Sequence, residues 1–151
     1  MKKLSICLII IMCFVITGCS GSKEKEVVSL EDFGTVTTDK GYVVFLQDYS
    51  SVSYINEARL AKIEGIEIEM INYTDAKYAK KVQDEQIEAF NLTKTTAAWE
   101  NKDKGKNYYR YELVSNGYYM INTRVDNTLI FCKTLLENKD KVLEVFNELG
   151  Y

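Results

Sequence analysis

The stretch YYRYELVSNGYYMINTRVDNTLIFCKT, residues 108–134, decides the fold of this chain. Asn116-Gly117 is a residue pair that two-residue β-hairpin turns prefer, and strand-like runs flank it on both sides. Asp126-Asn127 is a plausible second turn of the same length. The stretch therefore predicts a three-stranded antiparallel meander over residues 108–115, 118–125 and 128–134.

The side chains of the meander alternate between two faces. With the registers that the two turns impose, one face is apolar enough to form a core, and the other is not purely polar. The core face carries Val114, Tyr119, Ile121, Thr123, Val125, Thr128, Ile130 and Cys132. The second face carries Tyr109, Tyr111, Leu113, Met120, Asn122, Arg124, Leu129 and Phe131. The sequence leaves open whether anything covers this second face.

Three helices are expected around the meander. Ser29, with Asp32 three residues later, can cap a first helix that stops at Gly41. Asp75 can cap a second helix that runs to residue 90 or 91, and a last helix spans about residues 138–149.

Further strands are expected before the meander. Residues 42–46 are apolar enough for a central strand, and residues 59–63 and 66–73 resemble a hairpin. Residues 92–107 are mostly polar and receive no strand. The sequence thus predicts an α+β fold: an antiparallel sheet of about six strands, in the order αβββ-αβββ-α, with helices mainly on one face.

The N-terminus carries a different signal. Lys2 and Lys3 precede about a dozen mostly apolar residues, 4–15, which suits a signal peptide and is short for a membrane-spanning helix. Residues 16–19, Ile-Thr-Gly-Cys, resemble the lipobox of bacterial lipoproteins. That resemblance implies a diacylglycerol on the Cys19 sulfur, cleavage before Cys19, and a lipid anchor on the extracytoplasmic side of the cell membrane. Two acyl chains on one residue hold a protein at a bilayer durably.

The expected organisation is a signal peptide over 1–18, a lipidated N-terminus and flexible tether over 19–28, and one α+β domain over 29–151. Cleavage removes Lys2 and Lys3, which leaves 17 of the 19 basic residues against 22 acidic ones, a net charge of −5. This acidic balance argues against a nucleic-acid partner. Of the four cysteines, only Cys132 would remain as a thiol, and we expect it to be buried.

Residues 29–151 as a whole resemble small uncharacterised lipoproteins of low-GC Gram-positive bacteria. The resemblance rests on the Ser-x-x-Asp-Phe opening at 29–33, Asp75-Ala76, the run Thr-Arg-Val-Asp-Asn-Thr-Leu-Ile at 123–130, and the closing Leu-Gly-Tyr at 149–151. It implies a compartment and an architecture, and no activity.

The chain has no histidine, which removes the commonest general base and nucleophile partner and the commonest nitrogen ligand of metals. We therefore expect no enzyme activity, no cofactor and no metal site. The clustered tyrosines suggest instead a binding surface formed by Tyr109, Tyr111, Trp99 and Arg124, where aromatic rings and a guanidinium could contact a glycan or a protein. Ordinary strand propensity and a structural cation–π pair explain the same residues without a ligand.

Three functions are open at this point. The first is a membrane-anchored, non-catalytic binding or interaction domain with a cell-envelope protein or glycan as its partner. The second is a carboxylate-dependent hydrolase of cell-wall polymers, which would need two of Glu67, Glu69 and Glu112 to face one cleft. The third is a structural cell-envelope factor.

Overall fold

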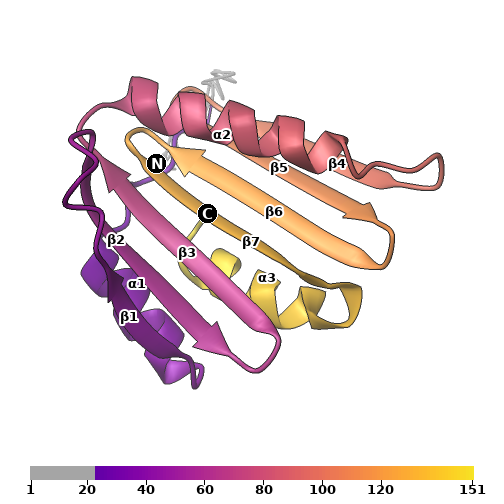
Figure 1. Cartoon of the computed structure of the whole chain (residues 1–151), viewed down its shortest axis with the longest axis horizontal. Helices are drawn as coiled ribbons and strands as arrows, with labels where there is room; N and C mark the ends of the chain where they lie inside the picture. The colour runs from indigo at the N-terminus through magenta and orange to yellow at the C-terminus, as the bar shows by residue number, and fades with distance from the viewer. Residues whose placement is uncertain (1–22) are drawn as a thin grey trace, which may run out of the picture.

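The computed structural model describes residues 23–151 (Figure 1). They form one antiparallel sheet with the strand order β1-β2-β3-β7-β6-β5-β4, together with three α-helices. The elements run in the chain order α1 (Leu30–Asp39), β1 (Val43–Gln47), β2 (Ile55–Ile63), β3 (Ile66–Tyr73), α2 (Ala76–Asn91), β4 (Trp99–Lys104), β5 (Tyr108–Ser115), β6 (Tyr118–Val125), β7 (Thr128–Leu135), the 3-10 helix η1 (Leu136–Asn138) and α3 (Lys139–Glu148).

The predicted meander is confirmed as β5, β6 and β7. Asn116 and Gly117 both have positive φ, +53° and +77°, as a type I′ turn requires. Val125 pairs with Thr128, so the second turn also has two residues.

The predicted helix starts are confirmed. The Ser29 side chain accepts a hydrogen bond from the Asp32 amide at 3.0 Å, and Asp75 Oδ1 accepts one from the Lys77 amide at 2.8 Å. Each bond satisfies a backbone donor that the first helical turn leaves free. The last helix begins at Lys139, one residue from its expected start.

The number of strands differs from the prediction, because the polar stretch 92–107 contains β4. The sequence of β4 has no alternation of apolar residues, and β4 is a strand because it pairs with β5. The register runs from Trp99 opposite Val114 to Lys104 opposite Tyr109. The predicted central strand is also wrong in its position. Its residues form β1, which pairs only with β2 and lies at the edge of the sheet.

Helices lie on both faces of the sheet, and not mainly on one as expected (Figure 1). Helices α1 and α3 cover the predicted core face, where Phe33, Val145 and Phe146 are fully buried. Helix α2 lies on the opposite face, where Ala79 and Phe90 pack on the apolar side chains of the meander's second face. Exposure of so many apolar side chains to water would be unfavourable, and packing of α2 buries them.

Residues 23–28, which we call the strap, run beside the loop between β4 and β5. The side-chain amide of Asn107 clamps the backbone of Lys25: the Lys25 amide donates to Asn107 Oδ1 at 3.0 Å, and Asn107 Nδ2 donates to the Lys25 carbonyl at 2.8 Å. The Lys106 amide donates to the Lys23 carbonyl at 2.9 Å. The strap is thus attached to the domain before α1 begins.

No helix within residues 23–151 is long and apolar enough to cross a membrane. Cys132 is buried as predicted, and burial raises the pKa of its thiol to about 12. The thiol is therefore kept protonated and unreactive at neutral pH.

Candidate functional site

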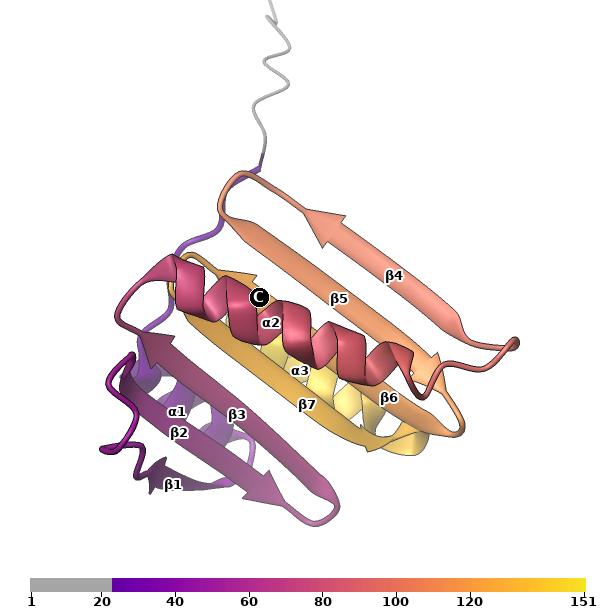
Figure 2. The ribbon, with the colours of Figure 1, turned by 45° about the horizontal axis from the view of Figure 1, so that its top comes forward.

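Helix α2 covers only part of its sheet face. It packs on β3, β6 and β7, and the side of β1 and β2 that faces the same way stays uncovered (Figure 2). We call this surface of β1 and β2 the open half. Strand β1 presents Val43 and Phe45 there, and they are 60% and 45% exposed. Large apolar side chains this exposed on adjacent positions of one strand face mark a candidate interaction surface.

A groove of about 340 Å³ lies where the open half meets α2. Its apolar wall combines side chains from the sheet and the helix, and its rim is charged. The lining residues are Leu60, Glu67, Glu69, Gln86, Ala89, Phe90, Phe131 and Lys133. An apolar floor with a few polar groups at its rim is the usual composition of a binding site.

The loop between β1 and β2 forms the end of the open half. Tyr49 in this loop donates from its hydroxyl to Glu69 Oε1 at 2.8 Å, and so joins the loop to the groove. A second hollow of about 460 Å³ lies beside Tyr49, between the loop and the first residues of β2. Burial and the Glu69 carboxylate raise the pKa of Tyr49 to about 12, so the phenol stays a hydrogen-bond donor.

The two groove carboxylates have different environments. Burial raises the pKa of Glu69, and the nearby charge of Glu67 adds to the shift, while the Tyr49 hydrogen bond opposes it. Glu67 is exposed and forms an ion pair with Lys62 at 2.7 Å. Both belong to β3 and lie two residues apart, so they point to the same side of the sheet. The groove can therefore offer one hydrogen-bonded and one solvated carboxyl group to a ligand.

The predicted aromatic surface is divided by the sheet. Tyr109, Tyr111 and Arg124 lie on the α2 side, and Trp99 lies on the α3 side. Trp99 is 46% exposed, and Lys139 Nζ of α3 lies 4.5 Å from its ring centroid. Because Trp99 starts β4, which the sequence did not reveal, its face could not be assigned in advance.

The tyrosines on the α2 side pack in the interior of the domain. Tyr111 is fully buried, and its hydroxyl donates to Asn91 Oδ1 of α2 at 2.9 Å. Tyr109 is half-buried and packs beside the cluster of Phe90 and Leu113. These rings hold α2 on the sheet. Their presence is therefore explained by structure, as the interpretation from strand propensity has it, and needs no ligand.

Arg124 lies opposite Tyr109, as the predicted register requires. Its guanidinium donates to Gln83 Oε1 of α2 at 3.2 Å and to the Asp126 carbonyl at 3.4 Å. Gln83 in turn donates to Asn122 Oδ1 at 2.8 Å. Arg124 therefore belongs to a polar network between helix and sheet. Asn122 extends this network by donating to Gln86, which lines the groove, whereas Arg124 itself does not line it.

Glu112 lies on the opposite face from Glu67 and Glu69, in the cluster of Arg110, Tyr119 and Asn101. Tyr119 donates to Glu112 Oε2 at 2.6 Å, and Arg110 Nε lies 3.0 Å from Oε1. Burial alone would raise the pKa of Glu112, but the bonds from Tyr119, Arg110 and Asn101 outweigh it and hold the pKa below its ordinary value. Glu112 is a buried structural anion, and it lines none of the grooves described above.

Two expectations concern sites of other kinds. Cys19, the expected lipidation site, lies outside the described residues. Within residues 23–151, no group of three or more cysteine, aspartate or glutamate side chains is placed to hold a metal ion.

Sequence reasoning missed the open half because it placed residues 42–46 in the centre of the sheet. An apolar run is equally compatible with a buried strand and with an exposed edge. The one available signal was length, because β1 has five residues, and short strands are common at sheet edges.

No family model matches the chain, and no curated protein matches it. Among solved structures, the chain is similar to a GTP binding regulator from Thermotoga maritima. The two share 18% sequence identity with a TM-score of 0.47, over 81% of this chain and 87% of that one. A likeness of this degree carries no argument about function.

Proposed function

We propose that this protein is a lipid-anchored, non-catalytic interaction domain of the cell envelope that binds an extended segment of a partner protein through its open half. The observation that carries the proposal is the exposed, apolar edge strand β1, with Val43 and Phe45 beside the groove. The anchor is supported by the lipobox-like residues 16–19.

A free edge strand can take another strand by backbone hydrogen bonds. β1 pairs with β2 on one side only, so its other side is available for an added strand. Alternate side chains of that strand would then lie next to Val43 and Phe45, on the sheet face that continues across β1 to the groove. Backbone pairing supplies affinity in this mode, and contacts of those side chains with Val43 and Phe45 supply selectivity.

Site-specific crosslinking tests the interaction. A photo-crosslinking residue at position 45 should form a discrete product in intact cells, and the same residue at position 102, on the exposed edge strand β4, should not. A matched Val43→Glu variant carrying the crosslinker at 45 should lose that product. Equal crosslinking from the two edges would overturn the proposal.

Acyl labelling tests the anchor separately. Cys19→Ala should abolish labelling with a fatty-acid analogue and block lipobox-type processing, because the acylated sulfur is gone. Cys19→Ser keeps the size of the side chain and should lose the label as well. Continued labelling of either variant would overturn the anchor.

A second candidate, a carboxylate-dependent hydrolase, has one observation in its favour: Glu67 and Glu69 line the same groove, and the pKa of Glu69 is raised. Such a pair could supply an acid and a base. Purified protein should then release soluble fragments from cell-wall polymer, and Glu67→Gln and Glu69→Gln should each abolish the release. Absence of release by the wild-type protein would exclude this candidate for the polymer tested.

A further inference from the structure

The strap is attached to one end of the domain by several independent contacts. Beside the Asn107 clamp on Lys25, Lys106 forms an ion pair with Glu24, and Lys25 Nζ lies 5.1 Å from the centroid of the Tyr108 ring. The Val28 amide donates to the Tyr151 hydroxyl at 3.3 Å. The chain is therefore held to the loop between β4 and β5 from its first described residue onward.

Close packing at Gly105 supports this attachment. A Cβ atom on Gly105 would lie 2.1 Å from the Lys23 carbonyl oxygen and 2.1 Å from the Tyr108 ring. The strap and the loop thus approach so closely that the loop position has no room for a side chain. Such complementarity is expected of a docked segment and not of a chain that merely passes by.

The strap limits how far the domain can move from an anchor at Cys19. Three residues separate Cys19 from Lys23, so the two Cα atoms are at most about 14 Å apart when the chain is fully extended. If residues 20–28 were all free of the domain, the Cα atoms of Cys19 and Ser29, the residue before α1, could be up to about 36 Å apart. Docking of the strap therefore brings the β4–β5 loop close to the anchored residue.

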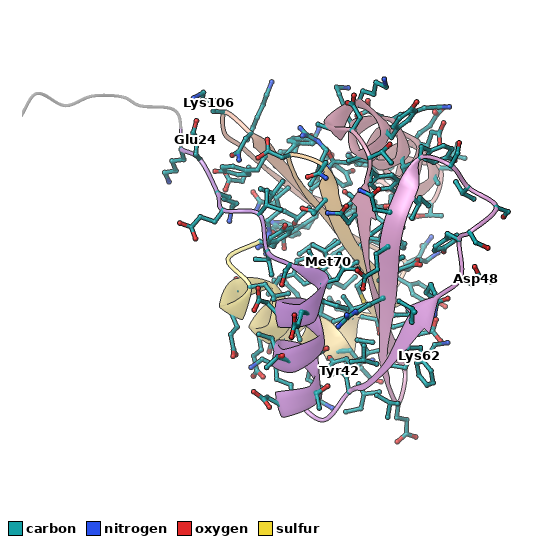
Figure 3. All side chains as sticks on the ribbon, turned by 90° about the vertical axis from the view of Figure 1, so that its left-hand side faces the viewer. Glu24, Tyr42, Asp48, Lys62, Met70 and Lys106 are labelled. Atoms are coloured by element: carbon teal, nitrogen blue, oxygen red, sulfur yellow. The ribbon has the colours of Figure 1, made fainter. Side chains whose placement is uncertain are left out.

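The open half lies at the other side of the molecule. Strand β1 is separated from β4 by six strand-to-strand steps, which is about 29 Å at the usual spacing. Figure 3 shows Glu24 and Lys106 on one side of the domain and Asp48 and Lys62, which belong to the β1–β2 region, on the other. A short connection from the anchor to the β4–β5 loop therefore leaves the open half facing away from the anchor.

We infer that the strap sets the orientation of the domain on the membrane, with the β4–β5 loop facing the bilayer and the open half facing away from it. This inference rests on the lipid anchor in the proposed function. It gives the strap contacts a role, because an untethered domain could turn β1 toward the headgroups and hide its apolar edge. It also places the lysine-bearing edge strand, β4, on the membrane side and the apolar edge on the partner side.

Depth measurement on the lipidated protein in liposomes tests the orientation. Lys104→Cys reports on the β4–β5 loop and Val43→Cys on the open half, each labelled with a fluorophore that spin-labelled lipid headgroups quench. Cys132 is 1% exposed and should not take the label. Quenching should be several-fold stronger at position 104 than at position 43.

Variants of the strap contacts make the test specific. Asn107→Ala removes the clamp on Lys25, and Lys106→Glu opposes Glu24 without touching Asn107; both should shrink the difference between positions 104 and 43. Asn147→Ala removes an exposed asparagine side chain of α3 that forms no hydrogen bond with residues 23–28; it is the matched control and should leave the difference unchanged. Thermal melting of each variant checks that the domain is folded.

The outcomes separate the inference from the proposed function. Absence of the acyl label on the wild-type protein would overturn the anchor and the orientation together. An acylated protein with equal quenching at the two positions would overturn the orientation alone. A difference that survives in both strap variants would overturn the role of the strap.

Discussion

The two edge strands of the sheet are built from opposite residue types. β1 is Val-Val-Phe-Leu-Gln and has no charged residue, whereas β4 is Trp-Glu-Asn-Lys-Asp-Lys and carries four. Charged side chains, and lysine above all, are a common protection against edge-to-edge association. The sheet therefore protects the β4 edge with charges and leaves the β1 edge able to pair, as the proposed binding mode requires.

The two edges are also held in place differently. β4 pairs with β5 and is also tied to the core by a polar contact, because Asn101 donates to Glu112 at 3.2 Å. β1 depends on backbone pairing with β2 and on packing of α1. Mutations on the β4 side should therefore affect stability, and mutations on β1 should affect the proposed binding.

The largest effect is expected from Glu112→Ala. This change leaves Arg110 without its buried partner and Tyr119 without its acceptor, so the free energy of unfolding should fall by about 3–5 kcal/mol. Glu112→Gln retains a hydrogen-bond acceptor and should cost less. Urea denaturation measures both, and a loss smaller than that of an ordinary surface mutation would contradict the contrast between the edges.

Trp99→Ala should have a smaller effect on the same edge. It removes the contact with Lys139 and the partly buried ring, for about 1 kcal/mol. Trp99→Phe keeps an aromatic face and should recover part of the loss. Hydrogen exchange of the β4 amides is the measurement, and unchanged exchange in Trp99→Ala would show that α3 does not help to hold this edge.

Phe45→Lys on β1 should change the free energy of unfolding by only about 0.5 kcal/mol, because the aliphatic stem of lysine can replace part of the contact of the half-exposed ring. The crosslinked product from an adjacent position should nevertheless disappear, since a lysine protects the edge. The reciprocal change, Lys102→Phe, gives β4 an apolar side chain on the same sheet face and serves as its control. A stability loss in Phe45→Lys as large as in Trp99→Ala would break the comparison.

The smallest effect is a pH dependence of opposite sign for two carboxyl groups. The pKa of Glu112 is lowered in the folded state, so its contribution to stability is present above the unfolded pKa of about 4.3 and is lost as pH falls through the folded pKa. The pKa of Glu69 is raised, so folding is disfavoured as pH rises through that value. Melting temperatures across pH 3–7 should show Glu112→Gln flattening the acid limb.

Glu69→Gln is the matched measurement. It should remove the loss of stability between the unfolded and folded pKa of Glu69, because glutamine keeps an acceptor for Tyr49 and has no charge to desolvate. An acid limb that changes in the same direction for both glutamine variants would contradict the assigned directions.

Local signals predicted much of the fold. The Asn116-Gly117 turn set the register that places Tyr109 opposite Arg124, and Ser29 and Asp75 set two helix starts. These features depend on a few neighbouring residues, so the sequence contains them directly. β4 has no such signal, because its residues form a strand only when they pair with β5. The sequence of one strand does not reveal which strand it pairs with.

The candidate site was harder to predict for the same reason. Tyr111 and Trp99 are near each other in type and in sequence, yet one is buried beneath α2 and the other lies on the α3 face. The open half depends on which strand is at the edge and on how far α2 reaches, and both follow from the whole topology. The exposed Phe45 was therefore visible only in the structure.

The strap has a mechanical consequence. A pull on the N-terminal side of Lys23 would reach the Lys106–Lys23 bond first, then the Asn107 clamp, and then the Val28–Tyr151 contact, one after another. Contacts that are loaded one at a time break at low tension. Each break frees a few more residues of the strap. Modest tension would thus separate the strap from the β4–β5 loop, while α1 and the sheet stay intact.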